Sequence, residues 1–155
     1  MPITLAVALQ GWVTRTPGLW LSPDGDRTTP AVRSGTVLVV DDDRNVRRLT
    51  ARMLRTEGYR VLEAGSGPEA LAVLEQEPGV HLMVTDIVMP EMHGLELADE
   101  AMSRLPGLKV LLMTGHAPEL TVQLDLRKSP LPVLLKPFSK EQLSGKVRKA
   151  LSEGD

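Results

Sequence analysis

The sequence contains no cysteine. Disulfide bonds and thiolate metal sites are therefore excluded, and the composition favours a cytoplasmic protein. Long apolar runs are also missing, because the longest one near the N-terminus covers only residues 3–9 and no Lys or Arg precedes it. A membrane-spanning helix needs about 20 apolar residues and a signal peptide begins with basic ones. We therefore expect a soluble chain with no membrane partner.

A strong net charge is absent as well, since 18 basic and 20 acidic residues leave a formal charge of -2. This balance gives no reason to expect nucleic acid as a direct partner. Hydrophobic residues make up 42% of the 155 residues and charged residues 25%, which is close to the average of globular proteins. The sequence thus predicts one domain that is long enough to bury a core.

Residues 1–35 differ from the rest of the chain. Prolines interrupt every possible helix in this segment, at Pro2, Pro17, Pro23 and Pro30. Both tryptophans, Trp12 and Trp20, also lie here, where isolated aromatic side chains could dock on a surface. The composition favours a poorly ordered N-terminal tail or linker instead. We place the domain at residues 36–155.

From residue 36 onward, apolar strands alternate with amphipathic helices. The expected strands are 36–41, 60–64, 80–86, 109–114 and 133–136. The expected helices are 44–57, 68–77, about 94–104, and a last one after Ser139, with Gln142 completing a capping box. Runs such as 37–40 are apolar without alternation, as in strands that are covered on both faces. The pattern predicts an α/β fold, a doubly wound five-stranded parallel sheet in a three-layer sandwich.

The helix 44–57 and the fourth crossover each show a further feature of this pattern. In helix 44–57, the apolar residues form one stripe that we expect to face the core: Val46, Leu49, Met53 and Leu54. The fourth crossover is interrupted by Pro118, Asp125 and the proline-rich run 129–132. It leaves room for two turns of helix at most.

Polar side chains with useful chemistry follow four of the strands. Asp41 and Asp42 follow the first, Asp86 the third, Thr114 the fourth and Lys136 the fifth. All strands of a parallel sheet end at one edge, where open α/β sheets bind ligands. Three carboxylates, a hydroxyl and an ammonium should therefore meet in one crevice, which suits a divalent metal and a phosphoryl group.

Each of these residues also has a simpler role. Two adjacent aspartates repel each other and favour Mg²⁺ between them, but Asp42 or Asp43 can instead cap the helix that follows. Asp86 beside a metal and a lysine can attack phosphorus and form an acyl phosphate. The hydroxyl of Thr114 can donate to a phosphoryl oxygen, or the residue can simply end a strand. Lys136 follows a buried strand and needs an anion, because an unpaired buried charge is costly.

Together, these residues resemble the receiver (phosphoacceptor) domain of two-component response regulators. The matching segments are Val37–Asp43, Val84–Gly94, Met113–Gly115 and Leu135–Phe138. Their order and spacing fit over roughly residues 36–151. The resemblance implies a flavodoxin-like, CheY-like sandwich with strand order 2-1-3-4-5. It also implies a signalling domain rather than an enzyme, one that catalyses only its own phosphotransfer and dephosphorylation.

The resemblance implies a role for each site residue. Asp86 would be the phosphoacceptor, Thr114 would sense the phosphoryl group and Lys136 would pair with it. The Mg²⁺ ligands would come from Asp41, Asp42, Asp86 and the backbone carbonyl of Val88. A histidine kinase or a histidine phosphotransfer protein would supply the phosphoryl group, and phosphorylation would switch the interaction with an unknown output protein.

Further features of the chain agree with the pattern of this family or depart from it. The Lys136–Pro137 peptide is expected to be cis. His93 stands where Asp or Asn is common, and Val133 removes the aromatic side chain that usually couples to the threonine. The shape of segment 111–138 is similar to receivers attached to hybrid histidine kinases. Five arginines crowd the first helix, which suits either a solvated face or a docking site for the phosphodonor; they are Arg44, Arg47, Arg48, Arg52 and Arg55.

Two other functions compete with this reading. A degenerate receiver would be a phosphorylation-independent protein-binding module, which the complete set of site residues disfavours. A Mg²⁺-dependent phosphatase of the haloacid dehalogenase type would carry an Asp-x-Asp motif with the nucleophile at the end of the first strand, which residues 41–45 match only in part. It would also need further acidic metal ligands, but no acidic pair ends a strand after Asp86. We expect a phosphorylatable receiver without an output domain, as a single-domain regulator or a piece of a larger kinase or regulator.

Overall fold

The computed structural model describes residues 35–115 and 131–153. The strands in these ranges are β2 (Thr36–Val40), β3 (Arg60–Ala64), β4 (Leu82–Asp86), β5 (Lys109–Thr114) and β6 (Val133–Leu135). The helices are α1 (Arg44–Thr56), α2 (Gly67–Gln76), α3 (Gly94–Arg104) and α5 (Lys140–Ser152). The tail expected at residues 1–35 and the interrupted fourth crossover lie outside these ranges except at their edges.

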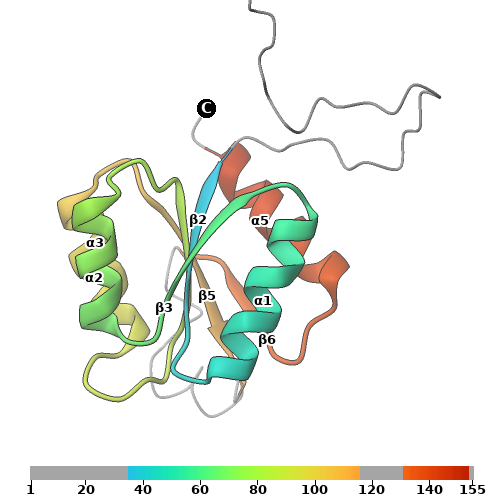
Figure 1. Ribbon diagram of the computed structural model, residues 1–155, viewed down its shortest axis with the longest axis horizontal. Coiled ribbons are helices and arrows are strands. Elements are labelled where there is room, and N and C mark those ends of the chain that lie inside the picture. The colour runs from blue at the N-terminus through green and yellow to red at the C-terminus, as the bar shows by residue number, and fades with distance from the viewer. Residues whose placement is uncertain (1–34, 116–130, 154–155) are drawn as a thin grey trace, which may run out of the picture. The chain divides into compact units, whose positions relative to one another are not determined.

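All five strands are parallel and lie in the order β3-β2-β4-β5-β6. Counted along the chain this is 2-1-3-4-5, which confirms the predicted order. In Figure 1, β2 runs downward and the chain turns into α1 at the lower edge of the sheet. Because the strands are parallel, all of them end at this lower edge, which we call the carboxyl edge.

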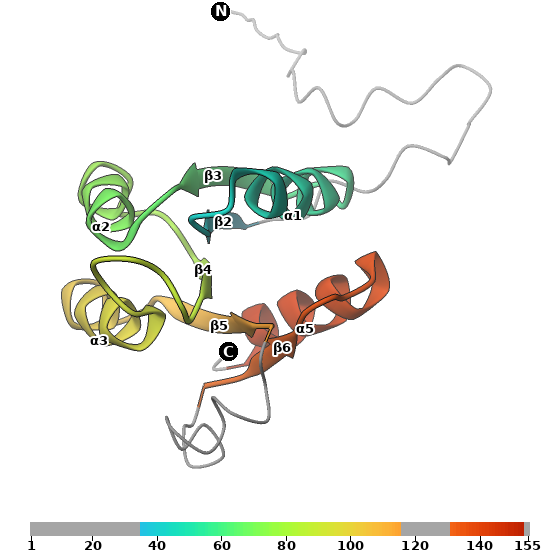
Figure 2. The ribbon, with the colours of Figure 1, turned by 90° about the horizontal axis from the view of Figure 1, so that it is seen from below.

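Helices cover both faces of the sheet, α1 and α5 on one side and α2 and α3 on the other (Figure 2). Neighbouring side chains of β2 therefore enter different halves of the core. Leu38 and Val40 pack with residues of α2 and α3, whereas Val37 and Val39 pack with residues of α1 and α5. All four are fully buried. The apolar run without alternation thus reflects a sheet covered on both faces, as predicted.

The buried face of α1 differs from the predicted stripe at one position. Leu49 is 55% exposed, whereas Thr50, Ala51 and Leu54 are buried. Thr50 can enter the core because its hydroxyl donates to the carbonyl of Val46 at 2.7 Å, which satisfies the polar group within the helix. The expectation that Leu49 faces the core was wrong, and its side chain is left on the outer surface.

The observed boundaries differ from the predicted ones by one or two residues. β4 begins at Leu82 rather than at residue 80, because the Val80 N–H donates to the carbonyl of Glu77 in the turn after α2. The capping box of α5 is confirmed: the Gln142 N–H donates to Ser139 Oγ at 3.1 Å, and the Ser139 N–H donates to Gln142 Oε1 at 2.8 Å. None of the helices in the described ranges is long and apolar enough to cross a membrane.

The turn between β4 and α3 depends on a glycine. The Gly94 N–H donates to the carbonyl of Ile87 at 2.7 Å, so the start of α3 lies directly against the end of β4. A Cβ atom at this position would overlap the carbonyl oxygen of Asp86 and would lie 2.8 Å from the Cα atom of Ile87. Both contacts are with backbone, which cannot move aside as a side chain can.

We therefore predict that Gly94→Ala destabilises the fold by about 1–3 kcal/mol, the usual cost of overpacking. Gly79→Ala is the matched control, because nothing lies within 4 Å of a Cβ atom placed there. Urea denaturation of the two variants and the wild type measures the difference. A Gly94→Ala variant as stable as Gly79→Ala would contradict the close approach of α3 to β4.

Candidate functional site

Lys136 joins the ends of three strands at the carboxyl edge. It follows β6, and its backbone N–H donates to the carbonyl of Thr114 at the end of β5, at 2.8 Å. Its Nζ atom lies 2.8 Å from Oδ2 of Asp41, directly after β2, and 3.3 Å from Oδ2 of Asp86, the last residue of β4. The lysine thus has the anionic partners that its position after a buried strand requires.

Asp41 is fully buried, yet both of its carboxylate oxygens have partners. Oδ2 pairs with Lys136, and Oδ1 accepts a hydrogen bond from the Asp43 N–H at 2.9 Å. A buried carboxylate is stable only with such partners. Asp41 therefore acts as the fixed anchor of the acidic segment.

The question of which aspartate caps α1 is answered by Asp43. Its Oδ1 accepts hydrogen bonds from the N–H groups of Asn45 and Val46, at 2.9 and 3.2 Å. Asp42, the residue before it, is exposed. Carboxylate oxygens of Asp41, Asp42 and Asp86 all lie within 4.8 Å of one another. Capping and an acidic cluster are thus both present, on different residues.

The charges of the cluster influence one another. Burial raises the pKa of Asp86 above its usual value; Lys136 lowers it and Asp41 raises it further, so that the net shift is upward. Burial alone would lower the pKa of Lys136, but its hydrogen bond to Asp41 and the charges of Asp86 and Asp41 outweigh burial and raise it. The lysine is therefore held in its charged form, whereas the ionised form of Asp86 is disfavoured.

The donor set fits a divalent metal ion. Three carboxylates and one ammonium within a few ångströms leave an excess of two negative charges when all are ionised. Mg²⁺ carries two positive charges and binds hard oxygen ligands such as these. A cation would also relieve the repulsion that Asp41 exerts on Asp86.

The remaining predicted residues surround this cluster. Thr114 is buried at the end of β5. Val88 is 47% exposed, and its backbone N–H bonds to the carboxylate of Asp86, which counteracts part of the upward pKa shift. The Lys136–Pro137 peptide is cis, as predicted. His93 is the residue before α3, and its N–H donates to Glu96 Oε1 at 3.2 Å, so the histidine serves the start of that helix.

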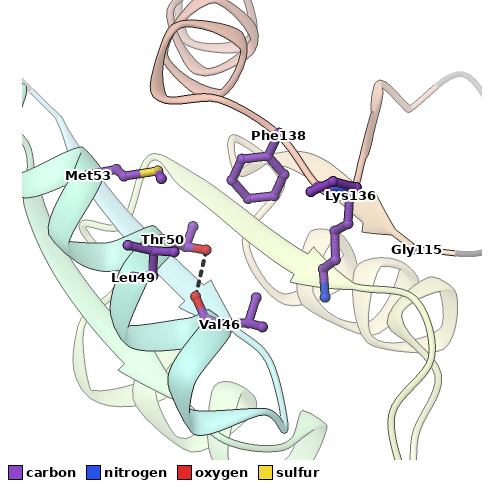
Figure 3. A pocket seen from close by; sticks show the side chains of 8 residues that line it. Val46, Leu49, Thr50, Met53, Gly115, Lys136 and Phe138 are labelled. Atoms are coloured by element: carbon purple, nitrogen blue, oxygen red, sulfur yellow. Dashed lines mark hydrogen bonds between the residues drawn. The ribbon is translucent and has the colours of Figure 1, made fainter.

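An apolar groove beside Lys136 was not predicted from the sequence. It encloses about 450 Å³ between α1 and the loop after β6. In Figure 3, Phe138 faces α1 across this groove, and the Lys136 side chain extends along its end. The groove is lined by Val46, Leu49, Thr50, Met53, Gly115, Lys136, Pro137 and Phe138. Its sequence signal is the set of three apolar residues on α1 that the helical stripe assigned to the core, namely Val46, Leu49 and Met53.

Arg47 was also missed, because it is one of five similar arginines on the first helix. Its Nη1 donates to the backbone carbonyl of Asp41 at 2.8 Å, and its Nε lies 3.5 Å from Oε1 of Glu63 on β3. Its side chain is only 19% exposed. No spacing rule separates this arginine from its neighbours.

The response regulator receiver domain model matches residues 37–148 of the chain. The response regulator receiver protein CpdR of Brucella abortus is 37% identical over 120 residues, which cover 74% of this chain and 95% of CpdR. The sensor kinase CckA of the same organism is 37% identical over 131 residues. These cover 84% of this chain but only 14% of the kinase, so this chain matches a small part of that protein.

Solved structures of proteins from this group superpose on the same part of the chain. The receiver domain of the hybrid histidine kinase CckA superposes with a TM-score of 0.64 at 30% identity, over 76% of this chain and 100% of that one. The chemotaxis protein CheY4 of Vibrio cholerae superposes with a TM-score of 0.67 at 28% identity, over 77% of this chain and 100% of that one. The similarity covers the α/β domain and the strand ends that carry the acidic cluster.

The raised pKa of Asp86 leads to a stability prediction. A carboxyl whose pKa is raised on folding costs stability in its ionised form, at pH values above the folded pKa. Asp86→Asn should therefore increase the free energy of unfolding at pH 7 in EDTA, while Lys136 keeps its bond to Asp41. The gain should vanish as the pH falls below the usual carboxyl pKa of 3.8, where the wild-type side chain is protonated in both states.

Urea denaturation in EDTA between pH 3.5 and pH 7.5 measures this effect. Asp99→Asn on the exposed face of α3 is the control and should change stability by less than about 0.5 kcal/mol. Mg²⁺ should then stabilise the wild type by about 2.7 kcal/mol at 100 times its Kd, and Asp86→Asn by less. A destabilised Asp86→Asn variant at pH 7 without metal would contradict the proposed electrostatics.

Proposed function

Because the chain belongs to the response regulator receiver domain family, we propose that it accepts a phosphoryl group on Asp86 and thereby switches its interaction with a partner. The domain that does this would extend over residues 36–155. The donor would be a phosphohistidine on a histidine kinase or a histidine phosphotransfer protein. The observation that carries the proposal is the placement of Lys136 between Asp41 and Asp86, with Asp42 beside them.

Asp86 is the carboxylate best suited to attack phosphorus. Asp41 is fully buried and has bonds on both oxygens, whereas Asp86 is partly exposed at the carboxyl edge and open to an incoming group. One oxygen of Asp86 would bond to phosphorus as the bond between phosphorus and the histidine nitrogen breaks. Lys136 lies near enough to Asp86 to pair with the phosphoryl oxygens after transfer. The hydroxyl of Thr114 would donate to another of these oxygens.

The acidic cluster would hold Mg²⁺ for this reaction. Asp42 and Asp86 would supply carboxylate ligands and Val88 its backbone carbonyl, while Asp41 would complete the negative field from its buried position. The metal supplies positive charge that neutralises the phosphoryl oxygens and keeps Asp86 ionised. Loss of the phosphoryl group to water in the same site would end the signal.

The phosphodonor would dock on the groove between α1 and the loop after β6. An apolar surface of this kind, next to a reactive centre, fits the apolar face of a donor helix. Leu49, which lines the groove, is 55% exposed. Arg44, Arg48 and Arg52 are exposed on the same helix and would favour a donor with acidic residues at the rim. The output protein stays unidentified, and Val133 lacks the ring of the usual aromatic relay.

Phosphorylation at Asp86 is tested by intact mass after incubation with Mg²⁺ and phosphoramidate. We expect one added phosphoryl group on the wild type and none on Asp86→Ala, because no other carboxylate of the cluster is both accessible and adjacent to Lys136. Asp43→Asn is the control: it removes a carboxylate next to the cluster but keeps a side-chain oxygen that can cap α1, because Asn caps helices about as well as Asp, and it should still be phosphorylated. EDTA should abolish the addition in every variant.

No addition on the folded wild type would favour the alternative function, a binding module that works without phosphorylation. Addition on Asp86→Ala would place the acceptor elsewhere and overturn the assignment.

Docking is tested by Leu49→Asp. A carboxylate in the groove should slow transfer from a phosphorylated histidine kinase or phosphotransfer protein by about tenfold or more, because one desolvated charge costs at least 1.4 kcal/mol in such a contact. The rate with phosphoramidate should stay within about twofold of the wild type, since this small donor needs no groove. Radiolabel transfer measures both rates.

Leu135→Asp is the matched control for the docking test, because Leu135 is 54% exposed on β6 but does not line this groove. For Leu135→Asp, the ratio of the transfer rate with the protein donor to the rate with phosphoramidate should equal that of the wild type. If Leu49→Asp slows both donors equally, the helix supports the chemistry rather than the docking, and the proposed surface is wrong.

A further inference from the structure

We propose that Arg47 is a positioning residue that sets the direction of the acidic segment 41–43, and that Glu63 on β3 holds Arg47 in place. The proposal rests on the proposed phosphoacceptor function only for its Mg²⁺ measurement. The hydrogen bonds that carry it are independent of any metal. Among the five arginines of the first helix, Arg47 thus belongs to the site and not to the surface.

The backbone of Asp41 is where the sheet ends and the site begins. Its N–H still follows the sheet, since it donates to the carbonyl of Ala64 at 3.2 Å. Its carbonyl accepts a hydrogen bond from Nη1 of Arg47 at 2.8 Å instead of a bond from a strand. The orientation of this peptide group decides where the next residue, Asp42, places its carboxylate. Arg47 therefore acts on the exposed acid through the backbone of the buried one.

Arg47 is itself held at two points. Its Nε faces Oε1 of Glu63 at 3.5 Å, and its own N–H donates to the carbonyl of Asp43 at 2.9 Å as the first bond of α1. Gly65 leaves room for the guanidinium, because a Cβ atom there would lie 3.2 Å from Nη1 of Arg47. A planar group with donors on two sides can join a carboxylate and a carbonyl, which a single ammonium does less well.

Arg55 provides an internal comparison. It pairs with the other oxygen of the same glutamate, with Nη1 3.2 Å from Oε2 of Glu63, and it donates to the carbonyl of Val61 at 3.0 Å. It thus supports the contact between α1 and β3 as Arg47 does. Within the described residues, its hydrogen bonds and ion pairs are with β3 and not with segment 41–43. The two arginines differ in the one contact that the proposal depends on.

The test compares Arg47→Met with Arg55→Met, which keep the apolar length of the side chain and remove the donors. Hydrogen exchange of the Asp43 N–H in EDTA is the first readout, because this amide bonds to Asp41 Oδ1. The quantity compared is the exchange rate of the Asp43 N–H divided by the exchange rate of the β3 amides. We expect Arg47→Met to raise this ratio at least tenfold and Arg55→Met to leave it within about twofold of the wild type. The second readout is the Kd for Mg²⁺ by calorimetry, which Arg47→Met should weaken about tenfold, as loss of an outer partner of a metal ligand does.

Glu63→Gln keeps the proposal testable if Arg47→Met does not fold. Glu63→Gln should also weaken Mg²⁺ binding, but by less than Arg47→Met. Where Arg47→Met folds, the double variant should have the same Kd for Mg²⁺ as Arg47→Met alone, because Glu63 acts through Arg47. Equal changes in Arg47→Met and Arg55→Met, or no change in either, would overturn the proposal. If the wild type binds no Mg²⁺, the metal part of the proposed function fails, and the exchange of Asp43 alone decides the role of Arg47.

Discussion

The ammonium of Lys136 between Asp41 and Asp86 is the contact on which the site depends. Two carboxylates at the ends of neighbouring buried strands repel each other, and without a cation between them the carboxyl edge would not tolerate both ionised. The lysine reaches them because β6 is the last strand of a sheet whose five members all end at one edge. One positive charge is not enough for three carboxylates, however. The remaining negative charge makes Asp86 costly to ionise, and the same charge favours the binding of a divalent metal ion.

Most of the fold follows from short-range patterns. Uninterrupted apolar strands such as Val37–Val40 signal a sheet covered on both faces, and the boundaries of α3 and β5 are given by glycine, proline and charged residues around them. The order of the strands does not follow in this way. Alternating strands and helices indicate a parallel sheet, but which strands are neighbours is a long-range property, and it came from the resemblance of four motifs to one family. The acidic cluster depends on the local residue pattern and on the strand order, because its aspartates come close only when the strands that they follow are neighbours in the sheet.

The sequence was misleading or undecided where tertiary contacts choose between locally equivalent residues. Helical periodicity gave α1 an apolar stripe that includes Leu49, yet the helix buries Thr50, whose hydroxyl bonds within its own helix. Spacing allowed either Asp42 or Asp43 to be the cap, and only the geometry assigns it to Asp43. Arg47 could not be distinguished from the other arginines of α1, because its partners Asp41 and Glu63 lie on two different strands.

These three cases all concern α1 and its cap, and they divide the helix by face. Its inner face meets the sheet and the acidic segment through Arg47, Thr50 and Leu54, each with a partner or a place in the core. Its outer face carries Leu49, Arg44, Arg48 and Arg52, which have no such role within the described parts of the domain. If the donor docks on α1 as proposed, changes on the outer face would alter which donor binds without moving the acidic cluster. Changes on the inner face cannot, because the first turn of the helix, its cap and the carbonyl of Asp41 form one continuous hydrogen-bonded unit. Under the proposed function, donor choice and phosphotransfer chemistry would thus be separable on this helix by about half a turn.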